Sequence, residues 1–357
     1  MAALNETPGH EHTVKPLGYF AAITDGPSTL RRVVRLIDEA GPHTRSPVDQ
    51  VLLTPIALGA SSIAAFRALR EERGTNVCFD SGGYYVQIGR ISFEALYPRL
   101  LALYRAHLWA DHYVLPDNVP TSRDSPTEVW AKIRQTVRWS RLFFEELPAT
   151  LRERAMPVVH GHTIEQADYA LSAYVAMGAR QVGFGSFGTF GANDGVNIAH
   201  TTSVEVARWV VRAAGERGMP VHFFGLGVPA LVAMIAGIGA RTFDSSAWLK
   251  SAGFGQITLP FARSYNITYR NTRSNLQRGI LWDEFTTLRQ LSGHACPYCE
   301  RYETLAESKW HRAAHNLICL SESVGALNRG EYDRIRAIYA GGSPKYRAEG
   351  ERWLPNA

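Results

Sequence analysis

The sequence predicts an α/β fold, a (β/α)8 TIM barrel followed by a small C-terminal subdomain. Short β-type runs alternate with longer amphipathic segments, which is typical of a parallel sheet with crossover helices. Eight such runs at roughly regular spacing favour a closed barrel over an open sheet. A Cys-x-x-Cys pair lies beyond the alternating region and indicates a separate module.

The expected strands are short runs rich in β-branched and aromatic residues. They cover residues 17–23, 51–57, 76–80, 111–117, 156–161, 180–185, 220–225 and 241–244. The clearest helical segments cover residues 127–147, 163–177, 203–217 and 229–238. Residues 261–278 then read as loops and irregular strands, and residues 303–327 read as helical. We expect a catalytic barrel over residues 1–285 and a subdomain with C-terminal helices over residues 286–357.

Composition limits the class of protein. The 357 residues are 45% hydrophobic and 20% charged, which excludes a disordered, collagen-like or coiled-coil chain. The net charge of +5 is a mild indication of a polyanionic partner. The segment MAALNETPGHEHTVKP has neither the basic nor the apolar region of a signal peptide, and the longest apolar stretch, 220–240, contains four glycines. We therefore expect a soluble cytoplasmic protein without a membrane span.

Polar residues stand at the ends of the expected strands, where a barrel places its active site. Asp80, Asp117 and Asp244 each end or follow a different strand. A single aspartate in this position is ordinarily the N-cap of the next helix. Three at one mouth indicate function, because crowded like charges are costly. One carboxylate can attack a sugar carbon while a second moves a proton, which predicts transfer chemistry at a glycosidic centre.

Small residues beside these aspartates predict a backbone cradle for a flat ligand, because glycine lets the main chain approach closely. They are Ser81, Gly82 and Gly83 after Asp80, and Gly225, Leu226 and Gly227 after the seventh strand.

The sequence also contains patterns that suit two other kinds of site, a dinucleotide site and a catalytic metal site. Residues 183–188 fit a GxGxxG pattern, but they lie late in the chain and TFGANDGVN follows instead of a helix. A substrate-contacting loop is therefore preferred to a dinucleotide site. His160 and His162 after the fifth strand would suit a metal-dependent hydrolase, although His222 does not complete a ligand set.

The cysteine module predicts a structural Zn²⁺ site. Cys296 and Cys299 form the CxxC, and His315 lies on a predicted helix. One more ligand, His294 or Cys319, would complete a tetrahedral set. The alternative is an unmetallated CxxC beside ordinary helix histidines.

Motifs between about residues 50 and 325 together resemble the tRNA-guanine transglycosylase family. In order they are FDSGGYY (79–85), VLPDNVP (114–120), VVHGHT and VGFGS (158–186), FFGLGVP (223–229), RTFDSSAWLKSAGFG (241–255) and CPYC…HNL (296–317). That family is a (β/α)8 barrel with a zinc-binding insertion. It exchanges guanine in a nucleic acid for a 7-deazaguanine base.

The resemblance implies a role for each matched residue. Asp244 would be the nucleophile that attacks the sugar C1′, and Asp80 the general acid/base. Asp117 would bind the Watson–Crick face of the incoming base. The heterocycle would also contact Gly185, Ser186 and residues 225–227, and zinc would be held by Cys296, Cys299 and His315.

Two positions depart from the family pattern. His160 stands where the family often has glutamine, which bears on base selectivity, and His294 stands where a first cysteine of the zinc motif would be. No C-terminal RNA-binding domain of the archaeal kind is recognised. This combination resembles the DNA-modifying branch, which inserts 7-cyano-7-deazaguanine or a related base into DNA. The alternatives are the same exchange on tRNA and an inactive nucleic-acid-binding partner subunit.

A basic stretch follows the expected nucleophile. Residues 245–282 contain no acidic residue and five basic ones, namely Lys250, Arg263, Arg270, Arg273 and Arg278. Tyr265 and Tyr269 are interleaved, which suits phosphate contact with base stacking. The alternative is a solvated loop. In duplex DNA the target guanosine would have to be flipped out, and the resemblance also allows a homodimer through the zinc subdomain.

Overall fold

The computed structural model describes residues 16–23, 25–42, 46–121, 123–185, 201–268, 279–341 and 344–355. One parallel sheet forms the centre of the fold. Its strands are β1 (Gly18–Ala22), β2 (Gln50–Leu53), β3 (Asn76–Phe79), β4 (His112–Val114), β5 (Ala155–Met156), β6 (Val158–Val159), β7 (Val182–Phe184), β8 (Val221–Phe223) and β9 (Thr242–Ser245).

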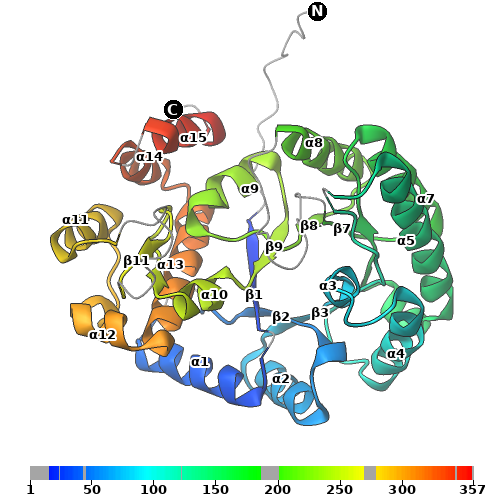
Figure 1. The fold of residues 1–357 in the computed structure, drawn as a ribbon, viewed down its shortest axis with the longest axis horizontal. Coiled ribbons are helices and arrows are strands. Elements are labelled where there is room, and N and C mark those ends of the chain that lie inside the picture. Colours follow the sequence, from blue (N-terminus) through cyan, green and yellow to red (C-terminus); the bar gives the residue numbers. More distant parts are fainter. Residues whose placement is uncertain are drawn as a thin grey trace, which may run out of the picture.

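The sheet closes into the expected barrel. Its strand order is β5-β4-β3-β2-β1-β9-β8-β7-β6, with every neighbouring pair parallel. The strands at the two ends of this order, β5 and β6, are separated along the chain only by Pro157. The sheet therefore returns to its starting point, and helices surround it on the outside (Figure 1).

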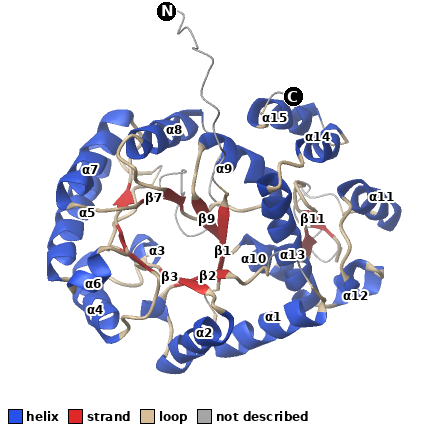
Figure 2. Ribbon diagram, turned by 180° about the vertical axis from the view of Figure 1, so that it is seen from behind, coloured by secondary structure: helices blue, strands red, loops and turns tan. Residues whose placement is uncertain are grey.

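Helices connect successive strands and form the outer layer (Figure 2). Around the barrel lie α1 (Pro27–Glu39), α2 (Ala60–Arg73), α3 (Gly83–Gln87), α4 (Phe93–Ala106), α5 (Pro126–Glu146), α6 (Ala149–Arg152), α7 (Ile164–Met177), α8 (Thr201–Gly215), α9 (Val232–Ile238) and α10 (Ala247–Gly253). A two-stranded antiparallel pair, β10 (Gln256–Ile257) and β11 (Tyr265–Asn266), follows. The chain continues through α11 (Trp282–Ser292), α12 (Tyr302–Glu307), α13 (Lys309–Asn328), α14 (Tyr332–Ala340) and α15 (Pro344–Trp353).

All eight expected strand regions contain a strand, and proline explains two differences in extent. The fifth is interrupted at Pro157, which has no N–H to donate to the sheet. The second ends at Leu53, because Pro55 begins a short 3-10 turn over Pro55–Ala57.

Local sequence signals account for the helix boundaries. Ser125 and Glu128 form a capping box, so α5 begins at Pro126. Thr163 and Gln166 form a second capping box at the start of α7, and Gly178 ends that helix in the left-handed conformation. The helices expected over 127–147 and 163–177 are confirmed to within one residue at each end.

The inside of the barrel is filled by a small set of buried side chains. They are Phe20, Ala22, Leu52, Cys78, Val114, Met156 and Val158, with the partly buried Phe224 against them. The larger apolar core lies between the strands and the surrounding helices. Because the interior is packed, the strand ends are left to form the mouth.

Helix α13 joins the C-terminal part of the chain to the barrel. It packs against α10, α1 and β1. Buried Asn316 donates through Nδ2 to the carbonyl oxygens of Trp248 and Gln256, both at 3.1 Å, and its Oδ1 accepts from the Thr258 N–H at 2.8 Å. The division of the chain at residue 285 stays a prediction.

No described helix combines the length and the apolar character that crossing a membrane requires.

Asn316→Ala should lower the free energy of unfolding by about 3 kcal/mol, because it leaves buried backbone groups without partners. Asn316→Asp is a second test variant, since it keeps the shape and the acceptor oxygen but loses the Nδ2 donor. This variant should also lower the free energy of unfolding, because the carbonyl oxygens of Trp248 and Gln256 lose their donor. Urea unfolding measures both variants, and losses below about 0.5 kcal/mol would show that Asn316 does not fix α13 to the barrel.

Candidate active site at the barrel mouth

Three aspartates lie at the carboxyl ends of barrel strands. Asp80 directly follows β3, Asp117 lies beyond the end of β4, and Asp244 lies within β9. Their charges act on one another, because Asp117 and Asp244 both raise the pKa of Asp80. The strand-end carboxylates singled out in the sequence are therefore gathered at one mouth.

Asp80 is held so that it can exchange a proton near neutral pH. Burial, and to a smaller extent the charges of Asp117 and Asp244, raise its pKa to about 7. The Thr54 hydroxyl donates to Oδ2 at 2.8 Å and the Gly82 N–H donates to the same oxygen at 3.3 Å, which opposes the rise. A carboxyl group with this pKa can serve as both acid and base.

Asp117 is buried and occupied on both oxygens. The Ser81 hydroxyl donates to Oδ1 at 2.5 Å, and His160 Nε2 lies 2.9 Å from Oδ2. Because a carboxylate only accepts hydrogen bonds, His160 carries a proton on Nε2. A Cβ atom on Gly83 would lie 2.4 Å from Oδ1, so this position needs glycine. Ser81, Asp117 and His160 thus form one connected group.

Asp244 is oriented by two donors. The Gly225 N–H donates to Oδ1 at 3.0 Å, and His222 Nε2 lies 3.2 Å from the same oxygen. The other ring nitrogen of His222, Nδ1, lies 2.9 Å from the Thr242 hydroxyl. One ring nitrogen therefore faces the Asp244 carboxylate and the other faces the Thr242 hydroxyl. Both ends of the ring are fixed, so the Asp244 carboxylate is fixed as well.

Sequence reasoning missed His222, which it considered only as a metal ligand. The signal was present in the strand register, because His222 pairs with Thr242 in the sheet and side chains two residues apart share a face. Thr242 and Asp244 therefore present their side chains to the same neighbouring strand. Thr54, whose hydroxyl donates to Asp80, was also missed. It was expected inside the strand over 51–57, but β2 ends at Leu53, directly before it.

Close approach explains the glycines of the expected cradle. Gly82 and Gly225 have positive φ values of 84° and 70°, which favour glycine. A Cβ atom on Gly185 would lie 2.6 Å from Cε1 of His160, and one on Gly227 would lie 2.3 Å from Cβ of Ser245. Leu226, between the two glycines of its motif, is fully buried. These positions let the backbone line the mouth.

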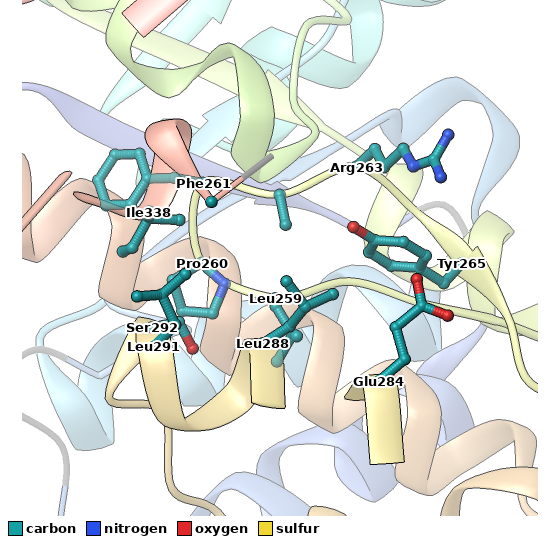
Figure 3. Close-up of a pocket in the computed structure, with 12 residues that line it drawn as sticks. Leu259, Pro260, Phe261, Arg263, Tyr265, Glu284, Leu288, Leu291, Ser292 and Ile338 are labelled. Carbon is teal, nitrogen blue, oxygen red and sulfur yellow. The ribbon is translucent and has the colours of Figure 1, made fainter. Parts of the chain in front are cut away.

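The basic stretch is only partly described. Its members Tyr269, Arg270, Arg273 and Arg278 lie outside the described residues, as does Ser186 after β7. Arg263 stacks over the ring of Tyr265 at 5.1 Å, and both line a cavity of about 170 Å³ beside α11 and α14 (Figure 3). Lys250, on α10, lies over the ring of Tyr84 at 6.0 Å.

The cysteine module forms a buried group that could bind a metal ion. One ligand atom from each of His294, Cys296, Cys299 and His315 lies within 4.8 Å of the others. His294, and not Cys319, is the fourth member of this group. Cys319 Sγ lies 3.6 Å from Nε2 of both histidines.

Two oxygen atoms outside the possible metal group orient the rings of His294 and His315. His294 Nδ1 lies 2.7 Å from Glu322 Oε2, and His315 Nε2 lies 2.8 Å from the Thr258 carbonyl oxygen. The inward nitrogens, His294 Nε2 and His315 Nδ1, are left facing each other at 3.3 Å. Metal-binding histidines are usually held in this way.

Among the described residues, the barrel mouth holds no comparable group of potential metal ligands. Within the described ranges, no second group of three potential ligands lies so close together. His160 is engaged with Asp117, and burial lowers the pKa of its neighbour His162.

Asp80→Asn should stabilise the chain at alkaline pH. The folded state binds the Asp80 proton more tightly than the unfolded state, so wild-type stability falls as the pH rises from about 4 to about 7. The variant escapes this loss, and its Tm should exceed that of wild type by about 4 °C at pH 8 and converge with it at pH 4.

Asp111→Asn is the matched control with the opposite sign. Burial raises the pKa of Asp111, but the hydrogen bonds from Arg70 and the Val77 N–H outweigh it and lower that pKa. This variant should be less stable than wild type at pH 8. An Asp80→Asn variant that is also less stable at pH 8 would contradict the environment described for Asp80.

Comparisons with known proteins add no family assignment. No model of a known protein family matches the chain, and no curated protein matches it.

Proposed function

We propose that the chain is a guanine transglycosylase that exchanges guanine in DNA for a 7-deazaguanine base such as 7-cyano-7-deazaguanine. One observation carries the proposal: the mouth holds a fixed carboxylate, Asp244, beside a carboxyl group with a pKa near 7, Asp80. Glycosyl exchange with retention needs this division of labour between a nucleophile and a proton carrier. The family resemblance of the motifs supports the same assignment.

The first displacement breaks the bond between guanine and the sugar. An Asp244 oxygen attacks C1′ and forms a covalent ester-like bond to the strand. The bonding electrons leave with guanine, and protonated Asp80 supplies the proton that the departing base needs. His222 and the Gly225 N–H, which both contact Oδ1, hold the carboxylate for this attack.

The second displacement reverses these roles. Ionised Asp80 takes a proton from the incoming 7-deazaguanine, whose ring nitrogen attacks C1′, and Asp244 leaves with the bonding electrons. No redox cofactor or nucleotide is needed. The connected group of Ser81, Asp117 and His160 would recognise the polar edge of the base, while Gly82, Gly185 and residues 225–227 would line its faces.

Exchange should follow the ionisation of Asp80. The first step needs the protonated acid and the second needs the carboxylate, so the rate should reach a maximum near pH 7 and fall on both sides. Asp244→Asn should lower exchange by about 10³-fold or more while the fold survives. Asp168→Asn, at an exposed carboxylate on α7, is the matched control.

The assay supplies labelled guanine and, separately, 7-cyano-7-deazaguanine, with duplex DNA in one reaction and unmodified tRNA in another. Label in DNA alone supports the proposal. Label in tRNA alone supports the same chemistry on the alternative substrate. Label in neither supports an inactive nucleic-acid-binding subunit and contradicts the enzyme assignment.

We also propose that the buried group in the C-terminal part binds a structural Zn²⁺ ion. Two thiols and two imidazoles suit zinc, and the absence of an exposed position among the four suits a structural role. The hydrogen bond from the Cys296 thiol and those from the two histidines lower the pKa of Cys299, which favours the thiolate that a metal needs.

Purified protein should contain about one zinc ion per chain. Cys299→Ser and His294→Ala should lose that zinc and lower the Tm, because the ligand set is broken. Cys319→Ser should retain it, since Cys319 lies outside the group. Elemental analysis by mass spectrometry measures the zinc, and loss of zinc in the Cys319 variant alone would reverse the assignment of the fourth ligand.

A further inference from the structure

A series of basic side chains, each lying over an aromatic ring, extends from the barrel mouth toward α13 and α1. Beyond the Lys250–Tyr84 pair, a Cβ atom on Gly253 would lie 4.0 Å from Cε of Lys309, so Lys309 passes beside the end of α10. Lys309 and Arg32 lie 5.0 and 4.7 Å from the ring centre of Trp310. We call Tyr84, Lys250, Lys309, Trp310 and Arg32 the rim band. Four of its five residues lie on α10, α13 and α1, which are next to one another in Figure 1, and Tyr84 lies on α3.

The rim band keeps its positive charge available. Arg32, Lys250 and Lys309 are exposed, and none of them forms an ion pair with a carboxylate in the part of the chain that the structure describes. By contrast Arg35, one turn further along α1 than Arg32, pairs with Glu39 at 3.4 Å. Unneutralised cations fixed against a ring are suited to binding an anion from outside the chain.

Aromatic surface accompanies these charges. Trp310 is partly exposed between its two cations, and Phe254, directly after Gly253, is 62% exposed. Exposed aromatic rings of this size stack on unpaired bases without regard to sequence. Exposed Glu307 stands before Lys309 and reduces the local charge, so stacking has to contribute to binding as well as phosphate contact.

We propose that the rim band binds a single-stranded segment of nucleic acid next to the nucleotide that enters the mouth. Arg32 and Lys309 contact backbone phosphates, and Trp310 stacks on a base. The band begins at Tyr84, directly after Gly83, on which a Cβ atom would lie 2.4 Å from Asp117 Oδ1. The band therefore starts at the mouth, and the bound segment would continue into the nucleotide at the reacting sugar. This inference rests on the proposed function and extends its substrate contacts beyond the basic stretch that follows Asp244.

The test is the affinity for a fluorescein-labelled, guanine-containing single-stranded oligodeoxynucleotide, measured by anisotropy over a range of KCl concentrations. The double variant Arg32→Ala/Lys309→Ala should reduce the dependence of log K on log[KCl] by about 1.4, which corresponds to two lost phosphate contacts. Trp310→Ala should weaken binding about fivefold or more with an unchanged slope. The matched control Arg67→Ala/Arg73→Ala removes two cations that are paired with Glu71 and Asp38, and should leave the slope unchanged.

Equal slopes for the rim-band and control double variants would overturn the inference. So would a wild-type dimer, detected by sedimentation, that Trp310→Ala dissociates without changing oligonucleotide affinity, because the band would then face a second copy of the chain. Base exchange is measured in parallel. Exchange without band-dependent binding overturns the inference alone, and band-dependent binding without exchange overturns the proposed function alone.

Discussion

The carboxylates of Asp80, Asp117 and Asp244 share one barrel mouth, and their mutual repulsion has to be offset by the groups around them. Each is accommodated differently. Asp117 takes a hydroxyl and an imidazole as donors, and Asp244 takes an imidazole and a backbone N–H. Asp80, with its pKa near 7, can exist in both protonation states around neutral pH. The three aspartates thus differ in their hydrogen-bond partners, and Asp80 has a raised pKa. These differences are the basis of the roles proposed for them.

The barrel makes this arrangement rigid through neighbouring strands. His222 on β8 is held between Thr242 and Asp244 on β9, so the sheet register itself aims the proposed nucleophile. The C-terminal part is joined to the same region. Asn316 holds α13 against α10, which begins just after Asp244, and His315 of the possible metal site binds the Thr258 carbonyl. A change in the His294, Cys296, Cys299 and His315 group would therefore disturb the packing next to the Asp244 region.

Alternation of strands and helices was sufficient to predict the barrel, and the strand-end rule was sufficient to find its three aspartates. The boundaries set by Pro55 and Pro157 were missed, because β propensity alone does not reveal where a backbone donor is lacking. The environment of each carboxylate also escaped prediction. It depends on contacts such as Ser81 with Asp117, which are distant in sequence and need the closed barrel. The choice of His294 over Cys319 likewise required three-dimensional distances.

The most direct test of the account is where nucleic acid becomes covalently attached. The chain is incubated with a guanine-containing oligonucleotide without incoming base, denatured and digested, and the cross-linked peptide is identified by mass spectrometry. The account predicts a sugar adduct on Asp244, in the peptide that contains FDSSAW. An adduct on Asp80 or Asp117 would reverse the assigned roles, and exchange that proceeds with no adduct on any aspartate would contradict the double displacement.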